Sequence, residues 1–106
     1  MKSETEYKIL KLVEQNPKIT QRQAAQELGV SLGKTHYVIK KLIEKGFIKF
    51  SNFKDAANKK SYIYFLTPKG FFEKSKLTKE FLDSKIKEYN RLEVEISMLK
   101  EESKRN

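Results

Sequence analysis

Cysteine is absent from this 106-residue sequence, and histidine occurs once, at His36. Without cysteine the chain has no disulfide, no thiol nucleophile and no cysteine-ligated zinc. A single histidine argues against a histidine metal cluster and against a catalytic triad built on histidine. The carboxylates are spread along predicted helical faces rather than paired. We therefore expect no catalytic site, no bound metal and no cofactor.

Long apolar runs are missing too. The longest contain only a few residues, whereas a membrane-spanning helix needs about 20, and the N-terminus lacks the apolar segment of a signal peptide. We therefore expect a cytoplasmic protein with no segment in a membrane. Hydrophobic residues still make up 38% of the chain, with seven Phe and five Tyr, which suffices for a single modest core.

Positive charge is what the sequence has in excess. The net charge is +9, from 23 Lys and Arg against 14 Asp and Glu. Residues 31–60 contain eight lysines, one glutamate and one aspartate, a net +6, so that only +3 is left for the other 76 residues. Such a concentration predicts a polyanionic partner, either nucleic acid or an anionic membrane surface. The membrane is the weaker choice, because the apolar stripe among these lysines is narrow and is needed for the core.

Two helices are predicted before residue 30. Residues 4–15 repeat apolar side chains every three to four positions, and Pro17 disfavours helix at the residue before it. A second helix is predicted over residues 21–28. Thr20 is its expected N-cap, and Gln23 three positions later completes a capping-box pattern.

A basic helix and a hairpin are predicted next. Ser31 is the expected cap of a helix from residue 32 to about residue 45, whose buried stripe leaves the lysines exposed. The sequence then becomes rich in aromatic and β-branched residues over 47–51 and 61–66, which indicates two strands. The polar segment 54–60 between them is expected to form the basic end of a hairpin.

The remaining third of the chain predicts a long helix. Thr67 is the expected cap and Pro68 the first helical residue, and no proline or glycine follows Gly70. A break near residues 75–78 is an alternative. Six apolar residues further along recur at spacings of 4, 3, 3, 4 and 3, which is typical of a coiled-coil seam. They are Leu82, Ile86, Tyr89, Leu92, Ile96 and Leu99. This seam predicts a dimer interface, and a helix packed on its own domain is the alternative.

The order of these elements is helix, short helix, turn, basic helix and basic hairpin, which predicts a winged helix-turn-helix. The expected fold class is therefore mainly α with a small β-hairpin. We expect a winged helix-turn-helix over residues 4–70, followed by a helical dimerisation tail of coiled-coil type over residues 71–103. In this fold the third helix enters the major groove of double-stranded DNA, and the exposed residues at its N-terminal end meet the base edges.

The DNA contacts are predicted from position and exposure. Base reading is expected from Gly33, Lys34, His36 and Tyr37, where side chains can donate to base edges and the glycine lets the backbone approach closely. The residues expected to contact the DNA backbone are Thr20, Gln21, Arg22, Ser31, Lys40, Lys41, Lys54, Lys59 and Lys60. Basic helix faces and lysines at a hairpin end also occur on surfaces that bind nothing, so the prediction rests on their combination.

Four motifs carry a family resemblance. They lie at residues 19–25 (Ile-Thr-Gln-Arg-Gln-Ala-Ala), 28–31, 42–48 (Leu-Ile-Glu-Lys-Gly-Phe-Ile) and 66–70 (Leu-Thr-Pro-Lys-Gly). Together they resemble the winged helix-turn-helix domain of MarR-type bacterial transcription regulators. Residues 33–37 and the helical tail are similar to short MarR-like regulators associated with exopolysaccharide gene clusters. The resemblance implies a regulator of exopolysaccharide genes that binds double-stranded DNA.

The sequence also departs from that family. Typical MarR proteins are longer, with an extra N-terminal helix and paired C-terminal helices that form the dimer and a ligand pocket. A single helical tail follows the hairpin here, so no ligand residues are transferred and no small-molecule effector is assigned. We expect a homodimer on a palindromic operator, because two recognition helices would lie about one DNA turn apart. The alternative function is a winged-helix protein-interaction module without a specific DNA site.

Overall fold

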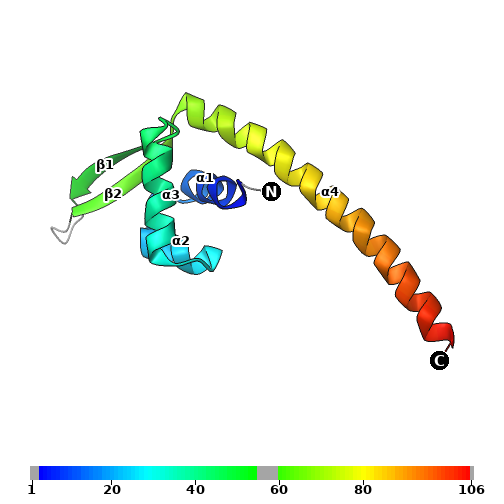
Figure 1. Ribbon diagram of the computed structural model, residues 1–106. Helices are drawn as coiled ribbons and strands as arrows, with labels where there is room; N and C mark the ends of the chain where they lie inside the picture. Colours follow the sequence, from blue (N-terminus) through cyan, green and yellow to red (C-terminus); the bar gives the residue numbers. More distant parts are fainter. Residues whose placement is uncertain (1–2, 55–59, 106) are drawn as a thin grey trace.

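The computed structural model describes residues 3–54 and 60–105 of the chain. These residues form four helices and one antiparallel sheet of two strands (Figure 1). The elements are α1 (Glu4–Gln15), α2 (Gln21–Leu28), α3 (Leu32–Glu44), β1 (Ile48–Lys54), β2 (Lys60–Leu66) and α4 (Pro68–Arg105). The predicted fold class, mainly helical with a small hairpin and a long C-terminal helix, is confirmed.

The molecule is elongated, with extents of 68 × 28 × 21 Å. Figure 1 shows α1, α2, α3 and the hairpin gathered at one end, while α4 runs away from them to the C-terminus. No helix in the described part of the chain is both long enough and apolar enough to cross a membrane.

The helix boundaries follow local signals in the sequence. The Thr20 hydroxyl accepts the backbone N–H of Gln23, and the Gln23 side chain accepts the backbone N–H of Thr20, which is the predicted capping box. Gly29 ends α2 in the left-handed region with φ of 67°, a conformation that glycine adopts without strain. Ser31 caps α3 by accepting the backbone N–H of Lys34 at 3.0 Å. The tight turn between α2 and α3 is therefore encoded locally.

One core holds the domain together. It is formed by side chains from α1, α3, the hairpin and the first part of α4, namely Ile9, Leu10, Val13, Val38, Ile39, Leu42, Phe47, Ile48, Tyr64, Leu66 and Leu77. Thr35 is fully buried beside it, and its hydroxyl donates to the carbonyl of Ser31, so that no polar group is left unsatisfied there. The core fixes α3 against the hairpin and leaves the opposite face of α3 to solvent.

The hairpin is longer than the sequence predicted. β1 continues to Lys54 instead of ending at residue 51, and β2 begins at Lys60. The strands stay in register from Ile48 opposite Leu66 to Lys54 opposite Lys60. Pairing with β2 keeps residues 52–54 in the strand, although Asn and Lys are weak strand formers. Residues 55–59, the rest of the predicted hairpin end, lie outside the described residues.

The start of α4 is packed tightly on the domain. A β-carbon at Gly70 would collide with the backbone carbonyl of Phe47, so only glycine fits there. The Gly70 N–H donates to the hydroxyl of Thr67 at 2.9 Å, as expected for a capping residue. Leu77 is buried, and the ring of Phe81 stacks on that of Tyr7 in α1 at 4.9 Å between ring centroids.

A single unbroken helix follows from there to Arg105, so the break considered near residues 75–78 does not occur. The division of the chain at residue 70 stays a prediction.

Candidate nucleic-acid interface

The N-terminal half of α3 presents side chains to solvent. Thr35, Val38, Ile39 and Leu42 form the buried stripe of this helix, so the residues between them point outward. Lys34, His36 and Tyr37 are exposed, and 64% of the surface of Tyr37 is accessible.

Gly33 is the second residue of α3, two positions after the cap Ser31. Nothing in the described structure lies within 4 Å of where a β-carbon would be. The helix backbone is therefore open to a close approach from outside at this point. The four residues predicted to read bases lie together at one exposed helix end.

His36 is exposed but takes part in a contact chain. Its ring nitrogen Nδ1 lies 3.0 Å from Oε1 of Gln21, and Nε2 of Gln21 donates to the Tyr64 hydroxyl at 3.2 Å. Gln21 is half-buried, so its amide ties the start of α2 to α3 and to β2. Both His36 and Gln21 were predicted to contact DNA. The structure places them beside the predicted interface. The contact between His36 and Gln21, which links α3 to α2, was not predicted from the sequence.

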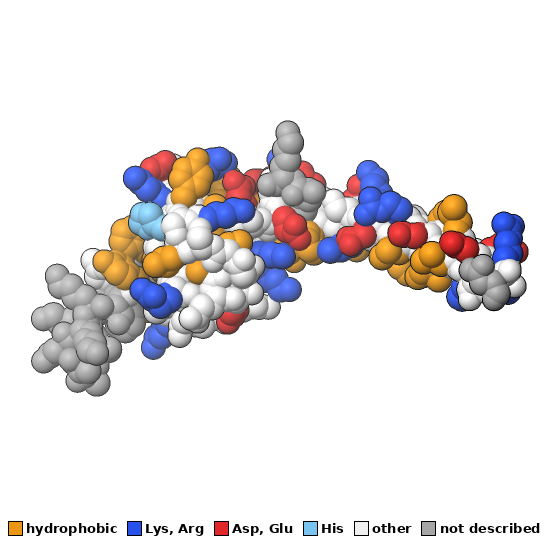
Figure 2. All heavy atoms as spheres, turned by 60° about the horizontal axis from the view of Figure 1, so that its bottom comes forward, with side chains coloured by type: hydrophobic (Ala, Val, Ile, Leu, Met, Phe, Trp, Pro, Cys, Tyr) orange, Lys and Arg blue, Asp and Glu red, His pale blue; other side chains and the backbone are white. Residues whose placement is uncertain are grey.

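A groove of about 790 Å³ lies between α3, the start of α2 and the hairpin. Its wall is aromatic, because Phe50, Tyr62 and Tyr64 share one face of the hairpin with ring centroids 5.7 to 6.5 Å apart. The other lining residues are Lys18, Ile19, Thr20, Gln21, His36, Ile39, Lys40, Ile43 and Glu44. Figure 2 shows hydrophobic side chains beside the histidine, with lysine and arginine side chains around them.

This groove was not predicted from the sequence. The signal for it was the alternation of Tyr62 and Tyr64, which places both rings on one face of a strand.

Three of the residues predicted to contact the DNA backbone line this groove, namely Thr20, Gln21 and Lys40. Thr20 and Ser31 are exposed at the N-termini of α2 and α3, where their hydroxyls already serve as caps. Arg22 and Lys40 are exposed, and Lys41 is half-buried. The backbones of Lys54 and Lys60 pair with each other at the far end of the hairpin, and Lys59 lies outside the described residues. Their roles as phosphate contacts stay predictions.

The predicted dimer seam lies apart from this surface, on the distal part of α4. All six side chains are exposed, with accessible fractions from 45% at Leu92 to 61% at Tyr89. The alternative, a helix that packs this face on its own domain, is therefore not what the structure shows. The domain instead covers the face that carries Leu77 and Phe81.

Comparison with known proteins agrees with this geometry. Residues 2–49 match the winged helix-turn-helix DNA-binding family. The chain is similar to the transcriptional regulator SlyA, with 33% identity and a TM-score of 0.61 over 74% of this chain and 54% of SlyA. The adhesin competence repressor AdcR from Streptococcus pyogenes is 27% identical, with a TM-score of 0.61 over 84% of this chain and 63% of AdcR. Both are MarR-family regulators.

A third structure shares the fold. The PadR-like transcriptional regulator from Bacillus cereus strain ATCC 14579 has a TM-score of 0.74 over 86% of this chain and 93% of its own, at 18% identity. The chain spans about half the length of SlyA. No curated protein matches the sequence significantly. The chain thus has the winged helix-turn-helix fold, residues 2–49 match a family described as winged helix-turn-helix DNA-binding, and two of its structural neighbours, SlyA and AdcR, are MarR-family regulators.

Proposed function

We propose that this protein is a transcriptional regulator that binds a specific double-stranded DNA site as a homodimer. One observation carries the proposal. The exposed end of α3, with Lys34 and Tyr37, projects from a winged helix-turn-helix domain whose positive charge is concentrated in residues 31–60. A polyanion is the partner that such a charge distribution attracts.

In the proposed complex α3 lies in the major groove. Lys34 donates to guanine acceptors, and Tyr37 contacts base edges by hydrogen bond or by its ring. Lys40 lies about two turns further along α3 and reaches a phosphate, which fixes the register of the helix on the duplex. The hairpin, with Lys54 and Lys60 at its far end, approaches the flanking backbone or minor groove.

The homodimer rests on the seam of α4. Six large apolar side chains are exposed on one face of a helix that extends beyond its domain, and exposed apolar stripes of this kind mark interaction sites. Two copies joined there carry two α3 helices related by a two-fold axis. A DNA site with the same symmetry, a palindrome, is the matching operator.

Two finer features follow from the resemblance of residues 33–37 and the tail to short MarR-like regulators. We propose genes for exopolysaccharide production as the targets and the bacterial cytoplasm as the place of action, without an enzymatic role. Transcript levels measured with and without the gene for this protein test the targets. Changes confined to genes unrelated to exopolysaccharide would remove this part of the proposal and leave DNA binding intact.

The first test is fluorescence anisotropy with the labelled upstream DNA of the gene and a scrambled duplex of equal length. We expect tight binding to the upstream DNA alone, which persists as the salt rises from about 50 to about 200 mM. Equal binding to both duplexes that disappears with salt would contradict the proposal. That result would favour a protein-interaction module, for which the aromatic groove offers an apolar surface.

A further inference from the structure

The seam of α4 extends further toward the domain than the six apolar residues. Phe71, Ser75 and Thr78 precede Leu82 at steps of four, three and four residues, so they continue the same helix face. All of them are exposed. This face lies about a quarter turn round the helix from the face that carries Leu77 and packs on the domain. A second helix could therefore run along nearly all of α4 without meeting α1.

We propose that a second copy of the chain binds this face with its α4 antiparallel, and with Leu82 opposite Leu92 of the partner subunit. The two-fold axis then crosses α4 at the level of Lys87. This inference rests on the homodimer proposed above and specifies its orientation and register. Three independent features of the seam favour it over a parallel pair.

The first feature is side-chain size. The seam is small and polar near the domain, at Ser75 and Thr78, and large and apolar near the C-terminus, at Ile96 and Leu99. In the proposed register Thr78 lies opposite Ile96 of the partner subunit, so a small side chain faces a large one and the interface fills evenly. A parallel pair would place small against small and large against large. The Thr78 hydroxyl donates to the carbonyl of Lys74 at 2.7 Å, so it can be covered without losing a partner.

The second feature is Lys85, which lies beside Ile86 on the seam, three residues after Leu82 and four before Tyr89. In a parallel pair it would face Lys85 of the partner subunit, a like-charge contact inside the interface. In the antiparallel register it faces Tyr89 of the partner subunit, whose ring can cover its aliphatic stem.

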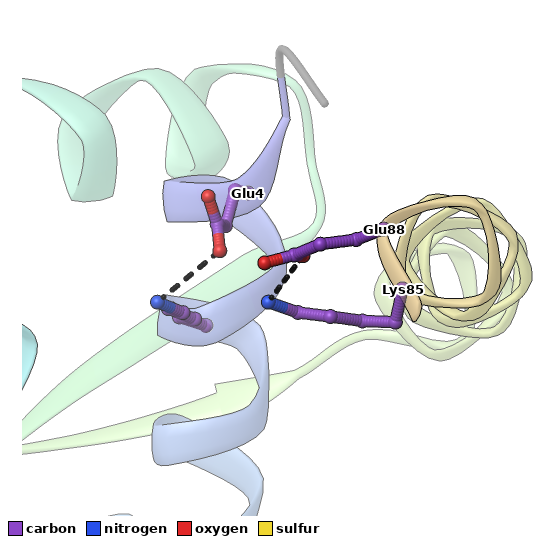
Figure 3. Close-up of polar contacts among 4 residues, drawn as sticks. Glu4, Lys85 and Glu88 are labelled. Atoms are coloured by element: carbon purple, nitrogen blue, oxygen red, sulfur yellow. Dashed lines mark hydrogen bonds and ion pairs between the residues drawn. The ribbon is translucent and has the colours of Figure 1, made fainter. Parts of the chain in front are cut away.

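The charged end of the Lys85 side chain lies to one side of the seam. Figure 3 shows Lys85 and Glu88 extending from α4 toward α1, where Lys85 Nζ lies 3.2 Å from Glu88 Oε2. The same Nζ lies 5.3 Å from the ring centroid of Phe81. Both charges can therefore stay at the edge of the antiparallel interface.

The third feature is the charge beside the seam. The antiparallel register brings Lys79 beside Glu93 of the partner subunit, twice by symmetry, and places the two Ile86 side chains together at the axis. In a parallel pair Glu88 would instead meet Glu93 of the partner subunit, and Lys74 would meet Lys79 of the partner subunit. The antiparallel register has one like-charge contact, between the two Glu88 side chains, against the two Lys79–Glu93 attractions, whereas the parallel pair has two kinds of like-charge contact and one attraction, between Glu95 and Lys100 of the partner subunit. The balance of charges therefore favours the antiparallel orientation. Lys79 makes no ion pair within the part of the chain that the structure describes, so it is available.

The register also suits two DNA-binding domains. Each domain is anchored on α4 near Leu77, ten residues from the proposed axis. The two anchor points are then about 30 Å apart along the helices, at a rise of about 1.5 Å per residue. Half-sites one helical turn apart are separated by about 34–36 Å. The separation of the anchor points in the antiparallel pair is therefore close to the spacing of neighbouring major grooves.

Cross-linking tests the orientation directly, because the chain has no natural cysteine. Leu82→Cys and Leu92→Cys proteins, one of them tagged, are mixed and treated with a short bismaleimide. In the proposed register, two copies of the same cysteine are ten residues apart along the helices, or about 15 Å, and the reagent is chosen too short to span that distance. We expect cross-linked mixed dimers and no cross-linked dimers of either variant alone. Cross-linked dimers of the Leu82→Cys protein alone would overturn the antiparallel register and leave the homodimer standing. A wild-type chain that stays monomeric in sedimentation at all concentrations would overturn the homodimer itself.

A charge exchange provides a second test that needs no cysteine. Lys79→Glu is expected to weaken dimerisation about tenfold, since an attractive pair becomes repulsive at two symmetric places. Glu93→Lys should do the same, and the double variant should recover most of the loss. Lys76→Glu, an equal charge change at an exposed position off the seam, is the control and should leave the dimer unchanged. Losses that simply add in the double variant would overturn the proposed pairing.

Discussion

The domain and the distal half of α4 are stabilised in opposite ways. In the domain, Leu10 and Leu42 are completely buried, and Leu28 of α2 packs against a core formed by α1, α3, the hairpin and the start of α4. On α4, every described side chain from Lys85 to Arg105 is exposed. The domain therefore contains its own hydrophobic driving force, whereas the distal helix buries no side chain among the residues that the structure describes.

This difference indicates where the order of the distal helix comes from. Isolated helices are marginal in water, and surface ion pairs such as Lys87 with Asp83, at 3.2 Å, contribute only tenths of a kcal/mol. Large apolar residues exposed on one face of such a helix are unfavourable in water unless another apolar surface covers them. The proposed dimer would cover the exposed apolar residues of the tail, whereas the domain already buries its own core. Variants that affect one region and spare the other test this division.

The largest effect is expected from a charge in the seam. Leu92→Glu should raise the dimer dissociation constant by more than about 100-fold, because two leucines lose their burial and two carboxylates face an apolar partner. Sedimentation velocity over a range of concentrations measures this change. At low concentration the thermal unfolding of the domain should be unaffected, because Leu92 touches no part of the core.

Val94→Glu is the matched control. Val94 is 61% exposed, as Tyr89 is, but it lies on the other side of α4 from the seam. We expect a change in dimer affinity of less than about threefold. Equal losses for Leu92→Glu and Val94→Glu would show that helix stability, and not the seam, controls association.

The next effect is expected at the joint between the two regions. Gly70→Ala should destabilise the domain by about 1–3 kcal/mol, because its β-carbon would force α4 away from the carbonyl of Phe47. Gly33→Ala introduces the same methyl group where nothing lies within 4 Å and should be neutral or stabilising by up to about 1 kcal/mol. Urea unfolding of both variants at one protein concentration gives the comparison. An unchanged unfolding free energy for Gly70→Ala would show that α4 is not tightly packed against Phe47.

The same division explains how much the sequence could predict. Thr20, Gln23, Gly29 and Ser31 act on residues within four positions, so the boundaries of α2 and α3 could be read locally. The outward direction of Tyr37 followed from the buried stripe of its own helix. In contrast, residues 52–54 are held in β1 by pairing with β2, and their own sequence did not predict a strand.

The candidate site shows the same limit. The exposed end of α3 could be predicted, because it depends on one helix. The link from Gln21 to Tyr64 spans 43 residues, and no local pattern indicates which side chain a glutamine will meet across such a distance. The aromatic groove depends in the same way on the packing of the hairpin against α3. Contacts between elements, more than the elements themselves, had to be seen in the structure.

Within the DNA-binding surface, base readers and phosphate contacts should separate. Lys34→Ala is expected to weaken binding to the specific site about 10- to 100-fold and to leave scrambled DNA nearly unaffected, since a base contact supplies about 1–3 kcal/mol of discrimination. Tyr37→Ala should act in the same direction. Lys60→Ala and Lys59→Ala should weaken binding to both duplexes equally. Each should also reduce the slope of the logarithm of affinity against the logarithm of salt concentration by about one. If all four variants behave alike in anisotropy titrations, α3 does not read bases.

The smallest effect is expected from the link that positions α2 against the hairpin. Tyr64→Phe removes the acceptor of the Gln21 amide and keeps the ring, which is 6% exposed, in the core. The loss should be about 1 kcal/mol of unfolding free energy, the usual net worth of one hydrogen bond. Tyr62→Phe makes the same change on a ring that is 51% exposed and should cost almost nothing. The difference in unfolding free energy between the two variants, measured by urea unfolding, gives the contribution of the hydrogen bond between Gln21 and Tyr64. A weaker affinity for specific DNA in Tyr64→Phe alone would show that Gln21 and His36 hold α3 in its binding position.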